Sequence, residues 1–203
     1  MRILYGTTNG AKLQAMRRAV EPIGIEIVGL RDMQGEIPKV QECGRTPLDN
    51  AEIKAKAYYK AFRMPVFSCD SGLYFRELRE EEQPGIYVRR VNGEELTDEA
   101  MIAHYASLAA QHGGRMTGQY RNGIYFVLDD QHHFSSMDLS IATEPFLLTS
   151  VPHPKRVQGF PIDALSVDIA SGQYYYDMEE QELAASVDAG IRAFFCGCLG
   201  IRR

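Results

Sequence analysis

The sequence predicts an α/β fold in which helices pack on a central β-sheet. Short apolar segments alternate along the chain with segments whose apolar residues have helical spacing. Two long segments in the middle of the chain are rich in Tyr, Phe, Val and Ile and are joined by a polar turn, which indicates paired antiparallel strands and therefore a mixed sheet. No internal repeat or low-complexity linker divides the chain, so residues 1–203 are expected to form a single domain.

The chain opens with a predicted strand, a polar loop and a helix. Residues 2–5 are apolar and lead into a polar turn, and residues 11–20 place Leu13, Met16 and Val20 on one helix face. The next elements are expected at residues 24–30 (strand), 31–47 (loop), 49–62 (helix) and 65–68 (a short strand ending at Cys69).

In the second half of the chain, the sequence predicts one helix, then several strands, then a last helix. A helix over residues 97–112 is capped by Thr97 and stopped by Gly113 and Gly114. The strands are expected at residues 116–128 and 134–148, joined by the turn 129–132, and at residues 165–169. The last helix is expected at residues 179–199, with Leu183, Val187, Ile191 and Phe194 on one face.

Composition is ordinary for a soluble globular protein and leaves a small polyanion open as a ligand. The chain is 45% hydrophobic and 24% charged, with a formal net charge of −5 and no Lys/Arg run, so polymeric nucleic acid is not expected as a partner. No segment is apolar over the length of a membrane span, and the N-terminus has no signal-peptide core. The four cysteines form no CxxC pair and are interpreted as free thiols in a reducing compartment, so a cytoplasmic location is expected.

A polar turn from Thr7 to Lys12 leaves the first strand and opens the first helix. Backbone N–H groups and the dipole at a helix N-terminus favour a bound anion, and Lys12 would reach a phosphate from the first turn. The alternative is that Asn9 or a threonine caps the helix and Lys12 is a solvated surface charge. The turn lacks the paired glycines and the Gly-Lys-Ser/Thr ending of a P-loop.

A second polar group surrounds the start of the helix at residues 49–62. Asn50 and Lys54 are four residues apart, so a helix places an amide and a cation on one face for one ligand. Glu42 lies in the loop just before them. The alternative is that Thr46 caps the helix and Lys54 pairs with nearby acids at the surface.

Asp70, Ser71 and Gly72 follow the short strand predicted at residues 65–68. Open α/β sheets place ligand sites at the carboxyl ends of strands, where Asp70 would ligate a metal or activate water. The alternative is an ordinary Asp-Ser-Gly turn.

Two arginines follow the predicted Pro84-Gly85 turn. Arg89 and Arg90 would clamp a phosphate, because guanidinium groups bind phosphate oxygens in pairs. The alternative is a surface pair with the acidic run at residues 80–82.

Taken in order, these motifs resemble the inosine triphosphate pyrophosphatase (Ham1-like) family of nucleotide hydrolases. Thr7, Asn9 and Lys12 match the family pattern Thr-x-Asn-x-x-Lys. Three longer patterns also match: Glu-x-Gly-x-Thr-x-x-x-Asn-Ala-x-x-Lys-Ala at residues 42–55, Asp-Asp-Ser-Gly-Leu at 69–73 with Cys69 for the first Asp, and Pro-Gly-x-Tyr-x-x-Arg at 84–90. Four gapped matches in the same order are hard to obtain by chance.

The resemblance implies a metal-dependent hydrolase that cleaves non-standard purine nucleoside triphosphates (ITP, XTP and dITP) to the monophosphate and pyrophosphate. Glu42 and Asp70 would serve Mg²⁺ or Mn²⁺ and the attacking water, and Lys12 would also be catalytic. The residues expected to bind the nucleotide are Thr7, Thr8, Asn9, Lys12, Asn50, Lys54, Ser71, Gly72, Arg90, Phe160 and Asp163. The resemblance also implies a three-layer fold of two lobes with a substrate cleft between them, and a homodimer.

The second half of the chain departs from the family pattern. Residues 159–164 keep the Gly, Phe and Asp of a Gly-Phe-Gly-x-Asp-Pro box but not its Pro. Residues 181–190 lack the Lys, His and Arg with which the family reads the purine, and Ser186-Val187-Asp188 is the nearest alignment. Two alternatives therefore stay open: the same chemistry with a different or broad base specificity, or a catalytically silent nucleotide-binding sensor.

Overall fold

The chain forms two compact units in a computed structural model that describes residues 1–201, apart from the side chains of residues 180–184. The first unit contains residues 1–71, 121–142 and those from 185 on, and the second contains residues 72–120 and 143–184. Two strands, β3 and β6, each run from one unit into the other. Within the described residues, no helix is long and apolar enough to cross a membrane.

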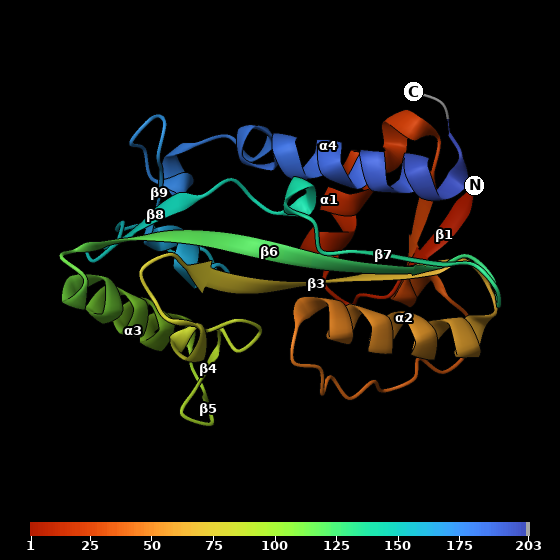
Figure 1. Cartoon of the computed structure of the whole chain (residues 1–203), viewed down its shortest axis with the longest axis horizontal. Coiled ribbons are helices and arrows are strands. Elements are labelled where there is room, and N and C mark those ends of the chain that lie inside the picture. The colour runs from red at the N-terminus through yellow and green to blue at the C-terminus, as the bar shows by residue number, and fades with distance from the viewer. Residues whose placement is uncertain (202–203) are drawn as a thin grey trace. The chain divides into compact units, whose positions relative to one another are not determined.

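Strands and α-helices alternate from β1 to β3, and two runs of strands, separated by α3, follow before the last helix (Figure 1). The helices are α1 (Gly10–Val20), α2 (Pro47–Phe62), α3 (Asp98–Gln111) and α4 (Glu180–Leu199). The strands are β1 (Arg2–Tyr5), β2 (Glu26–Gly29), β3 (Val66–Phe75), β4 (Arg90–Val91), β5 (Glu94–Glu95), β6 (Arg115–Val127), β7 (His133–Ser136), β8 (Phe146–Thr149) and β9 (Ser166–Asp168).

The main sheet is mixed, as the sequence predicts. Its strand order is β2-β1-β3-β6-β8-β9, and β7 also pairs with β6. Strands β2 and β3 run parallel to β1, whereas β7 and β8 run antiparallel to β6. The parallel pairs come from the N-terminal strand–helix repeats and the antiparallel pairs from the hairpin-like middle of the chain.

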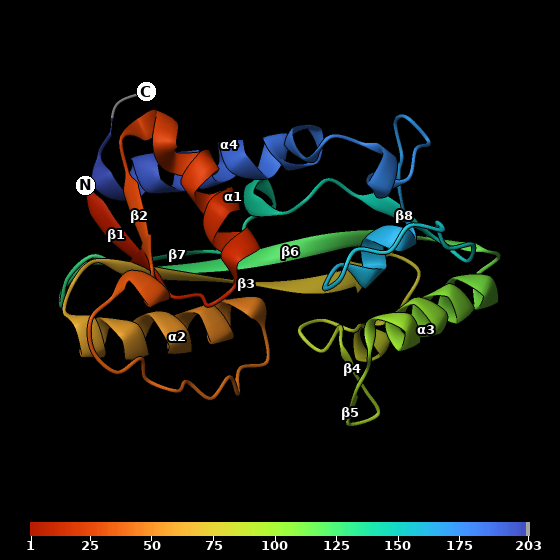
Figure 2. The same cartoon turned by 180° about the vertical axis from the view of Figure 1, so that it is seen from behind.

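In the first unit, helices cover both faces of the sheet (Figures 1 and 2). Because side chains alternate between the faces of a strand, Ile3 and Tyr5 pack in one cluster with residues of α1 and α4, and Leu4 packs in another with residues of α2. All three side chains are at most 1% exposed. The ends of β1 and β3 are therefore held between α1 on one face and α2 on the other.

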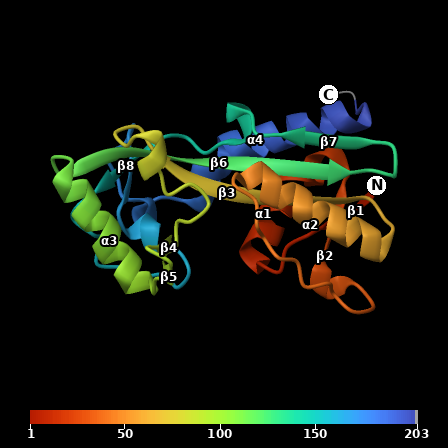
Figure 3. The same ribbon diagram turned by 60° about the horizontal axis from the view of Figure 1, so that its bottom comes forward.

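The second unit has its own hydrophobic core. Met101, Ile102 and Tyr105 of α3 pack with Phe146 of β8 and with Leu165. Thr97 caps α3, because its hydroxyl accepts the N–H of Ala100 at 3.2 Å. The short β4–β5 hairpin lies beside α3 (Figure 3).

Most predicted elements are confirmed to within a few residues, but two differ. Strand β3 does not end at Cys69 and continues to Phe75, so Asp70 and Ser71 lie inside a strand. The strand predicted at residues 134–148 is split into β7 and β8, because Asp138 accepts the N–H of Ser140 and opens a short helical turn. In the last helix, Ile191 packs in the core as predicted, whereas Leu183 lies outside the described side chains.

Candidate active site

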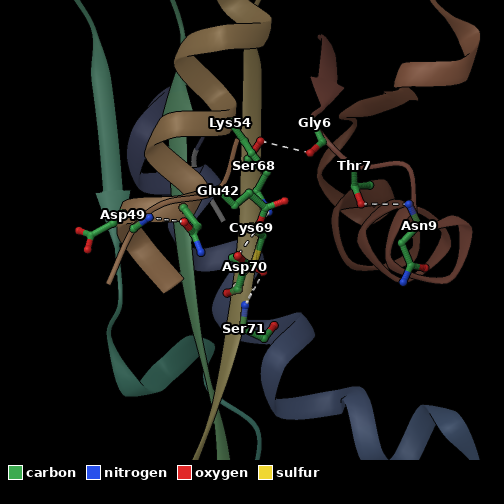
Figure 4. Close-up of polar contacts among 12 residues, drawn as sticks. Gly6, Thr7, Asn9, Glu42, Asp49, Lys54, Ser68, Cys69, Asp70 and Ser71 are labelled. Atoms are coloured by element: carbon green, nitrogen blue, oxygen red, sulfur yellow. Dashed lines mark hydrogen bonds and ion pairs between the residues drawn. The ribbon is translucent and has the colours of Figure 1, made fainter. Parts of the chain in front are cut away.

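The N-terminal turn of α1 is held by its own side chains. Asn9 Oδ1 accepts the backbone N–H groups of Ala11 at 2.9 Å and Lys12 at 3.2 Å, and Thr7 Oγ1 accepts the N–H of Asn9. Asn9 therefore caps the helix, as the alternative interpretation predicts. Figure 4 shows the contact between Thr7 and Asn9. Thr8 and Asn9 are exposed, so the turn remains accessible to a ligand.

The loop that carries Glu42 is fixed to the N-terminus of α2. Thr46 and Asp49 form a capping box: Thr46 Oγ1 accepts the N–H of Asp49 at 3.1 Å, and Asp49 Oδ2 accepts the N–H of Thr46 at 3.0 Å. Asn50 is only 4% exposed, and its Oδ1 accepts the N–H of Gly44 at 2.8 Å. This hydrogen bond from Gly44 to Asn50 holds the loop against α2. Position 44 has no room for a side chain, because an added Cβ would collide with Asn50.

Two acids and two lysines from four segments of the first unit form one chain of ion pairs. Asp70 of β3 lies 3.8 Å from Lys12 Nζ and 3.4 Å from Lys54 Nζ. Lys54 Nζ also donates to Glu42 Oε2 at 3.1 Å. The order is therefore Lys12, Asp70, Lys54, Glu42, with acids and bases alternating. Figure 4 shows the last three of these residues.

The centre of this cluster is shielded and its ends are open. The side chains of Lys54 and Asp70 are 13% and 17% exposed, whereas those of Lys12 and Glu42 are 40% and 46% exposed. Lys54 thus pairs with nearby acids, as the alternative interpretation predicts, but it is shielded and does not lie at the surface. Four residues that the sequence motifs single out therefore converge on one site, to which β3 contributes Asp70 from its middle.

Gly6 permits the close approach of β1 to β3 beside this site. An added Cβ at Gly6 would collide with Ser68 Oγ and would lie 2.5 Å from the Tyr58 ring. The Ser68 hydroxyl donates to the carbonyl oxygen of Gly6 at 3.3 Å. A side chain at position 6 would therefore displace the loop that carries Thr7 and Asn9.

Ser71 is held by a residue that the motifs do not include. Its hydroxyl donates to Asn122 Oδ1 at 2.7 Å, and Asn122 Nδ2 donates to the carbonyl oxygen of Ile141 at 2.6 Å. The second contact fixes which end of the amide faces Ser71. In the sequence, Asn122 is a polar residue inside a long predicted strand. Strand propensity alone does not tell whether such a residue faces the site or the solvent.

Cys69 occupies the position where the family pattern has its first Asp. Burial raises the pKa of the Cys69 thiol to about 11, with the Asp70 charge acting in the same direction and the two lysines opposing it. The thiol is therefore neutral at pH 7 and adds no negative charge to the cluster. Asp70 and Glu42 are its two acidic groups.

The second unit holds the remaining predicted residues. Arg90 is exposed on β4, and Gly72 is buried where β3 meets Gly85, whose N–H and carbonyl pair with those of Leu73. Arg89 contacts Asp98 at 2.7 Å, so it does not pair with the acidic run at residues 80–82. The phosphate clamp predicted for the two arginines stays a prediction.

Phe160 and Asp163 lie on one segment of the second unit. The Phe160 ring is 45% exposed, and its carbonyl oxygen accepts the Tyr176 hydroxyl at 2.6 Å. Burial raises the pKa of the Asp163 carboxyl to about 6, and among the side chains that the structure describes this carboxyl has no hydrogen-bond or ion-pair partner. Burial raises the pKa values of Tyr120 and Tyr175, and the Asp163 charge adds to both shifts, so these two residues lie close to Asp163.

Comparison with known proteins identifies the family. The sequence model described as the Ham1 family matches residues 3–141. The chain belongs to the Ham1 family. Among its relatives, a dITP/XTP pyrophosphatase of a Bradyrhizobium species is 33% identical over 126 residues, 62% of this chain and 56% of that protein. A dITP/XTP pyrophosphatase of Oceanobacillus iheyensis is 33% identical over 101 residues, 50% of each chain. This Ham1 chain thus spans about half the length of these curated relatives.

Solved structures of the family share the fold. A HAM1 protein from Coxiella burnetii superposes with a TM-score of 0.75 and 20% identity, over 98% of this chain and 96% of that one. The Staphylococcus aureus Ham1 protein superposes with a TM-score of 0.72 and 21% identity, over 97% and 99% of the two chains. The mixed α/β architecture is therefore that of Ham1 proteins, including the C-terminal part beyond the matched residues.

Proposed function

We propose that this chain is a metal-dependent nucleoside triphosphate pyrophosphatase that hydrolyses non-standard purine triphosphates such as ITP, XTP and dITP to the monophosphate and pyrophosphate. The observation that carries the proposal is the alternating cluster of Lys12, Asp70, Lys54 and Glu42. The relatives named dITP/XTP pyrophosphatase support the substrate class.

The two acids fit a hard divalent cation. Mg²⁺ binds few protein carboxylates and completes its coordination with water and substrate phosphate oxygens. Asp70 and Glu42 supply two carboxylates that share Lys54 as a neighbour, and no group of three or more His, Cys, Asp or Glu ligands occurs among the described residues. Asp70 and Glu42 would hold Mg²⁺ or Mn²⁺, which neutralises phosphate charge and lowers the pKa of a bound water.

The lysines and the helix terminus supply the rest of the phosphate site. A triphosphate that binds at Lys12 and Lys54 replaces the carboxylates as partner of the two ammonium groups, so both acids become available to the cation. Asn9 and the threonines at the start of α1 would contact the terminal phosphates, and Lys12 would offset the charge that develops on pyrophosphate.

The reaction requires one water and no covalent intermediate. The water oxygen forms a bond to the α-phosphorus, the bond from that phosphorus to the bridging oxygen breaks, and pyrophosphate leaves with that oxygen. Asp70 accepts the water proton, because it is the shielded carboxylate of the cluster. Positioning and charge stabilisation supply the remaining rate enhancement.

A nucleotide-binding sensor without turnover is the second candidate. It is favoured by the neutral Cys69 thiol next to Asp70, which leaves the site with one acid fewer than the family pattern. Lysines that bind phosphates do not by themselves distinguish the two functions.

The deciding experiment measures pyrophosphate release from ITP, XTP, dITP, GTP, ATP and pyrimidine triphosphates with Mg²⁺, Mn²⁺ or a chelator. We expect metal-dependent release that is fastest from ITP, dITP and XTP. Equal release across the panel would retain the chemistry and reject the purine assignment. Binding without release from any nucleotide would reject the enzyme in favour of the sensor.

We propose further that the protein acts as a cytoplasmic homodimer on free nucleotides. The location rests on four free cysteines, which suit a reducing compartment. The dimer rests on the family resemblance. Light scattering at micromolar concentration tests it, and a mass of one chain would reject it.

A further inference from the structure

Two segments of the second unit carry residues that we expect to bind the nucleotide. Arg90 begins strand β4, and Phe160 stands directly before the helical turn at Pro161–Ala164. Both side chains are exposed, and the Phe160 ring is 45% exposed. The two residues are remote in sequence, so only tertiary contacts decide where one stands relative to the other.

Asp98, the first residue of α3, contacts the neighbours of both residues through one carboxylate. Its Oδ1 lies 2.7 Å from Arg89 Nη2, and its Oδ2 accepts the backbone N–H of Gly159 at 2.8 Å. Arg89 directly precedes Arg90, and Gly159 directly precedes Phe160. The hydrogen bonds from Gly159 and then from Arg89 lower the pKa of the Asp98 carboxyl, so it is ionised at pH 7.

Arg89 is used by the protein itself, which leaves Arg90 as the exposed arginine of the two. Arg89 Nη1 donates to the carbonyl oxygen of Leu96 at 3.0 Å, and its own carbonyl oxygen accepts the N–H of Leu96 at 2.8 Å. With Nη2 on Asp98, these contacts fasten the β4–β5 hairpin to the start of α3. The family pattern at residues 84–90 leaves position 89 open, so the motif does not supply this link.

The backbone around Phe160 is held from several sides. Gly159 has a φ of +85°, a left-handed conformation that glycine adopts easily, and its N–H donates to Asp98. The N–H of Phe160 donates to the carbonyl oxygen of Val157 at 3.1 Å, and its own carbonyl oxygen accepts the Tyr176 hydroxyl at 2.6 Å. The exposed ring is therefore presented from a fixed backbone that is attached to Asp98 at one end.

The start of α3 is a rigid support for these contacts. Thr97 caps the helix, and Met101 and Tyr105 pack in the core of the second unit with at most 3% exposure. The Tyr105 hydroxyl also donates to the carbonyl oxygen of Val88, just before the hairpin, at 2.9 Å. A carboxylate in the first turn of a helix is favoured by the helix dipole. Asp98 thus stands on an element that packing holds in place.

We propose, on the basis of the proposed function, that Asp98 is a positioning residue for the nucleotide. Its carboxylate sets where Arg90 and Phe160 stand relative to each other, so that both side chains bind the same substrate molecule. Asp98 itself contacts neither the substrate nor the reacting atoms. Contacts that hold the substrate equally in the ground state and the transition state raise KM when they are lost and leave kcat unchanged.

The test compares Asp98→Ala with Glu99→Ala. Glu99 pairs with Arg156 at 2.8 Å, so its replacement loosens the segment before Gly159 but keeps both contacts of Asp98. Asp98→Ala should raise KM for ITP, and the dissociation constant of ITP measured by calorimetry with chelator, about tenfold, while kcat stays within about threefold. Glu99→Ala should change each constant by less than about twofold. A fall in kcat for Asp98→Ala with unchanged KM and dissociation constant would show a purely structural role and overturn the proposal.

Asp98→Asn covers the case in which the alanine variant does not fold. It keeps an oxygen for the N–H of Gly159 but loses the charge that pairs with Arg89, so it should raise the dissociation constant of ITP by less than Asp98→Ala does. A dissociation constant equal to that of the wild type would overturn the proposal.

Double variants ask through which residues Asp98 acts. Asp98→Ala is combined with Arg90→Ala and, separately, with Phe160→Ala. In each pair the rise in the dissociation constant of ITP should be smaller than the product of the two single rises, because part of what Asp98 positions is already absent. Rises that multiply in full in both pairs would show that Asp98 acts through neither residue, which overturns the proposal.

The outcomes also separate this inference from the proposed function. Weaker ITP binding by Asp98→Ala, when the wild type releases no pyrophosphate with Mg²⁺, keeps the positioning role and rejects the enzyme. Pyrophosphate release by the wild type, with unchanged KM and dissociation constant in Asp98→Ala, keeps the enzyme and rejects the positioning role. A wild type that binds no nucleoside triphosphate rejects both.

Discussion

Asp70 in the first unit and Asp163 in the second are both partly buried, yet their surroundings are opposite. Asp70 lies within 4 Å of two lysine ammonium groups and accepts the backbone N–H of Ser71 at 3.1 Å. Asp163 lies near tyrosine rings, and burial raises its pKa to about 6. The first unit thus surrounds a carboxylate with cations, whereas the second surrounds a carboxyl with uncharged rings, so burial favours its protonated form.

The largest expected effect comes from neutralising the acid of the first unit. Asp70→Asn should lower kcat by roughly 10²- to 10⁴-fold, because the proposed acceptor of the water proton is removed. Asp130→Asn is the matched control, since Asp130 is 70% exposed and its ion pair with Arg63, at 3.4 Å, involves no residue of the cluster. Steady-state kinetics of both variants would contradict the role of Asp70 if their kcat values agreed within a few-fold.

The two lysines around Asp70 differ in exposure, since Lys54 is shielded and Lys12 is open to solvent. Lys12→Met and Lys54→Met should each weaken nucleotide binding roughly ten- to hundredfold through loss of a charged contact. Only Lys54→Met should also lower the free energy of unfolding, by about 1–3 kcal/mol, because it leaves the shielded Asp70 with less compensation. Urea unfolding measures the free energy of unfolding of each variant. An equal decrease in both would show that the exposure of the lysine does not decide its effect on stability.

Asp163 should make the protein less stable as the pH rises, whereas an acid in an ion pair makes it more stable. Because the native state keeps its proton up to about pH 6 and the unfolded chain releases it near 3.8, the native state binds more protons in this window. The free energy of unfolding therefore falls as the pH rises from 4 to 6, on the order of 2 kcal/mol at 1.36 kcal/mol per unit. The titratable groups around it, Tyr120, Tyr175 and Tyr176, have raised pKa values and do not titrate there.

The measurement is a difference between two proteins, since other acids titrate in the same range. Wild type minus Asp163→Asn isolates the contribution of this carboxyl to unfolding at pH 4 and pH 7. Between pH 4 and pH 7, the free energy of unfolding of the wild type should fall by more than that of Asp163→Asn. A pH-independent difference would mean that Asp163 is well solvated.

The smallest expected effect compares a helix cap in each unit. Asn9→Ala and Thr97→Ala remove the caps of α1 and α3, and each should cost about 1 kcal/mol of stability. Only Asn9→Ala should also raise KM, because its helix opens at the proposed phosphate site. An equal effect of both variants on KM would show that the start of α1 does not bind the substrate.

Local patterns in the sequence predicted most helices and strands, because helix spacing, caps and turn residues act within a few positions of each other. Thr97 and Thr46 are examples, since both cap the helices they precede. The division of residues 134–148 was missed because one side-chain contact from Asp138 outweighed strand propensity.

Ordered motifs were enough to single out Lys12, Glu42, Lys54 and Asp70 from the sequence, because they match the patterns of a known family. The folded structure was needed to see what these and other polar residues contact. It placed Asn50 under a loop and made Asn122 the partner of Ser71, 51 positions away. It also brought Asp188 onto the wall of a cavity with Lys12. The physical reason is that hydrogen bonds and ion pairs depend on distance in space, and residues remote in sequence become neighbours only when strands pair and helices pack on them.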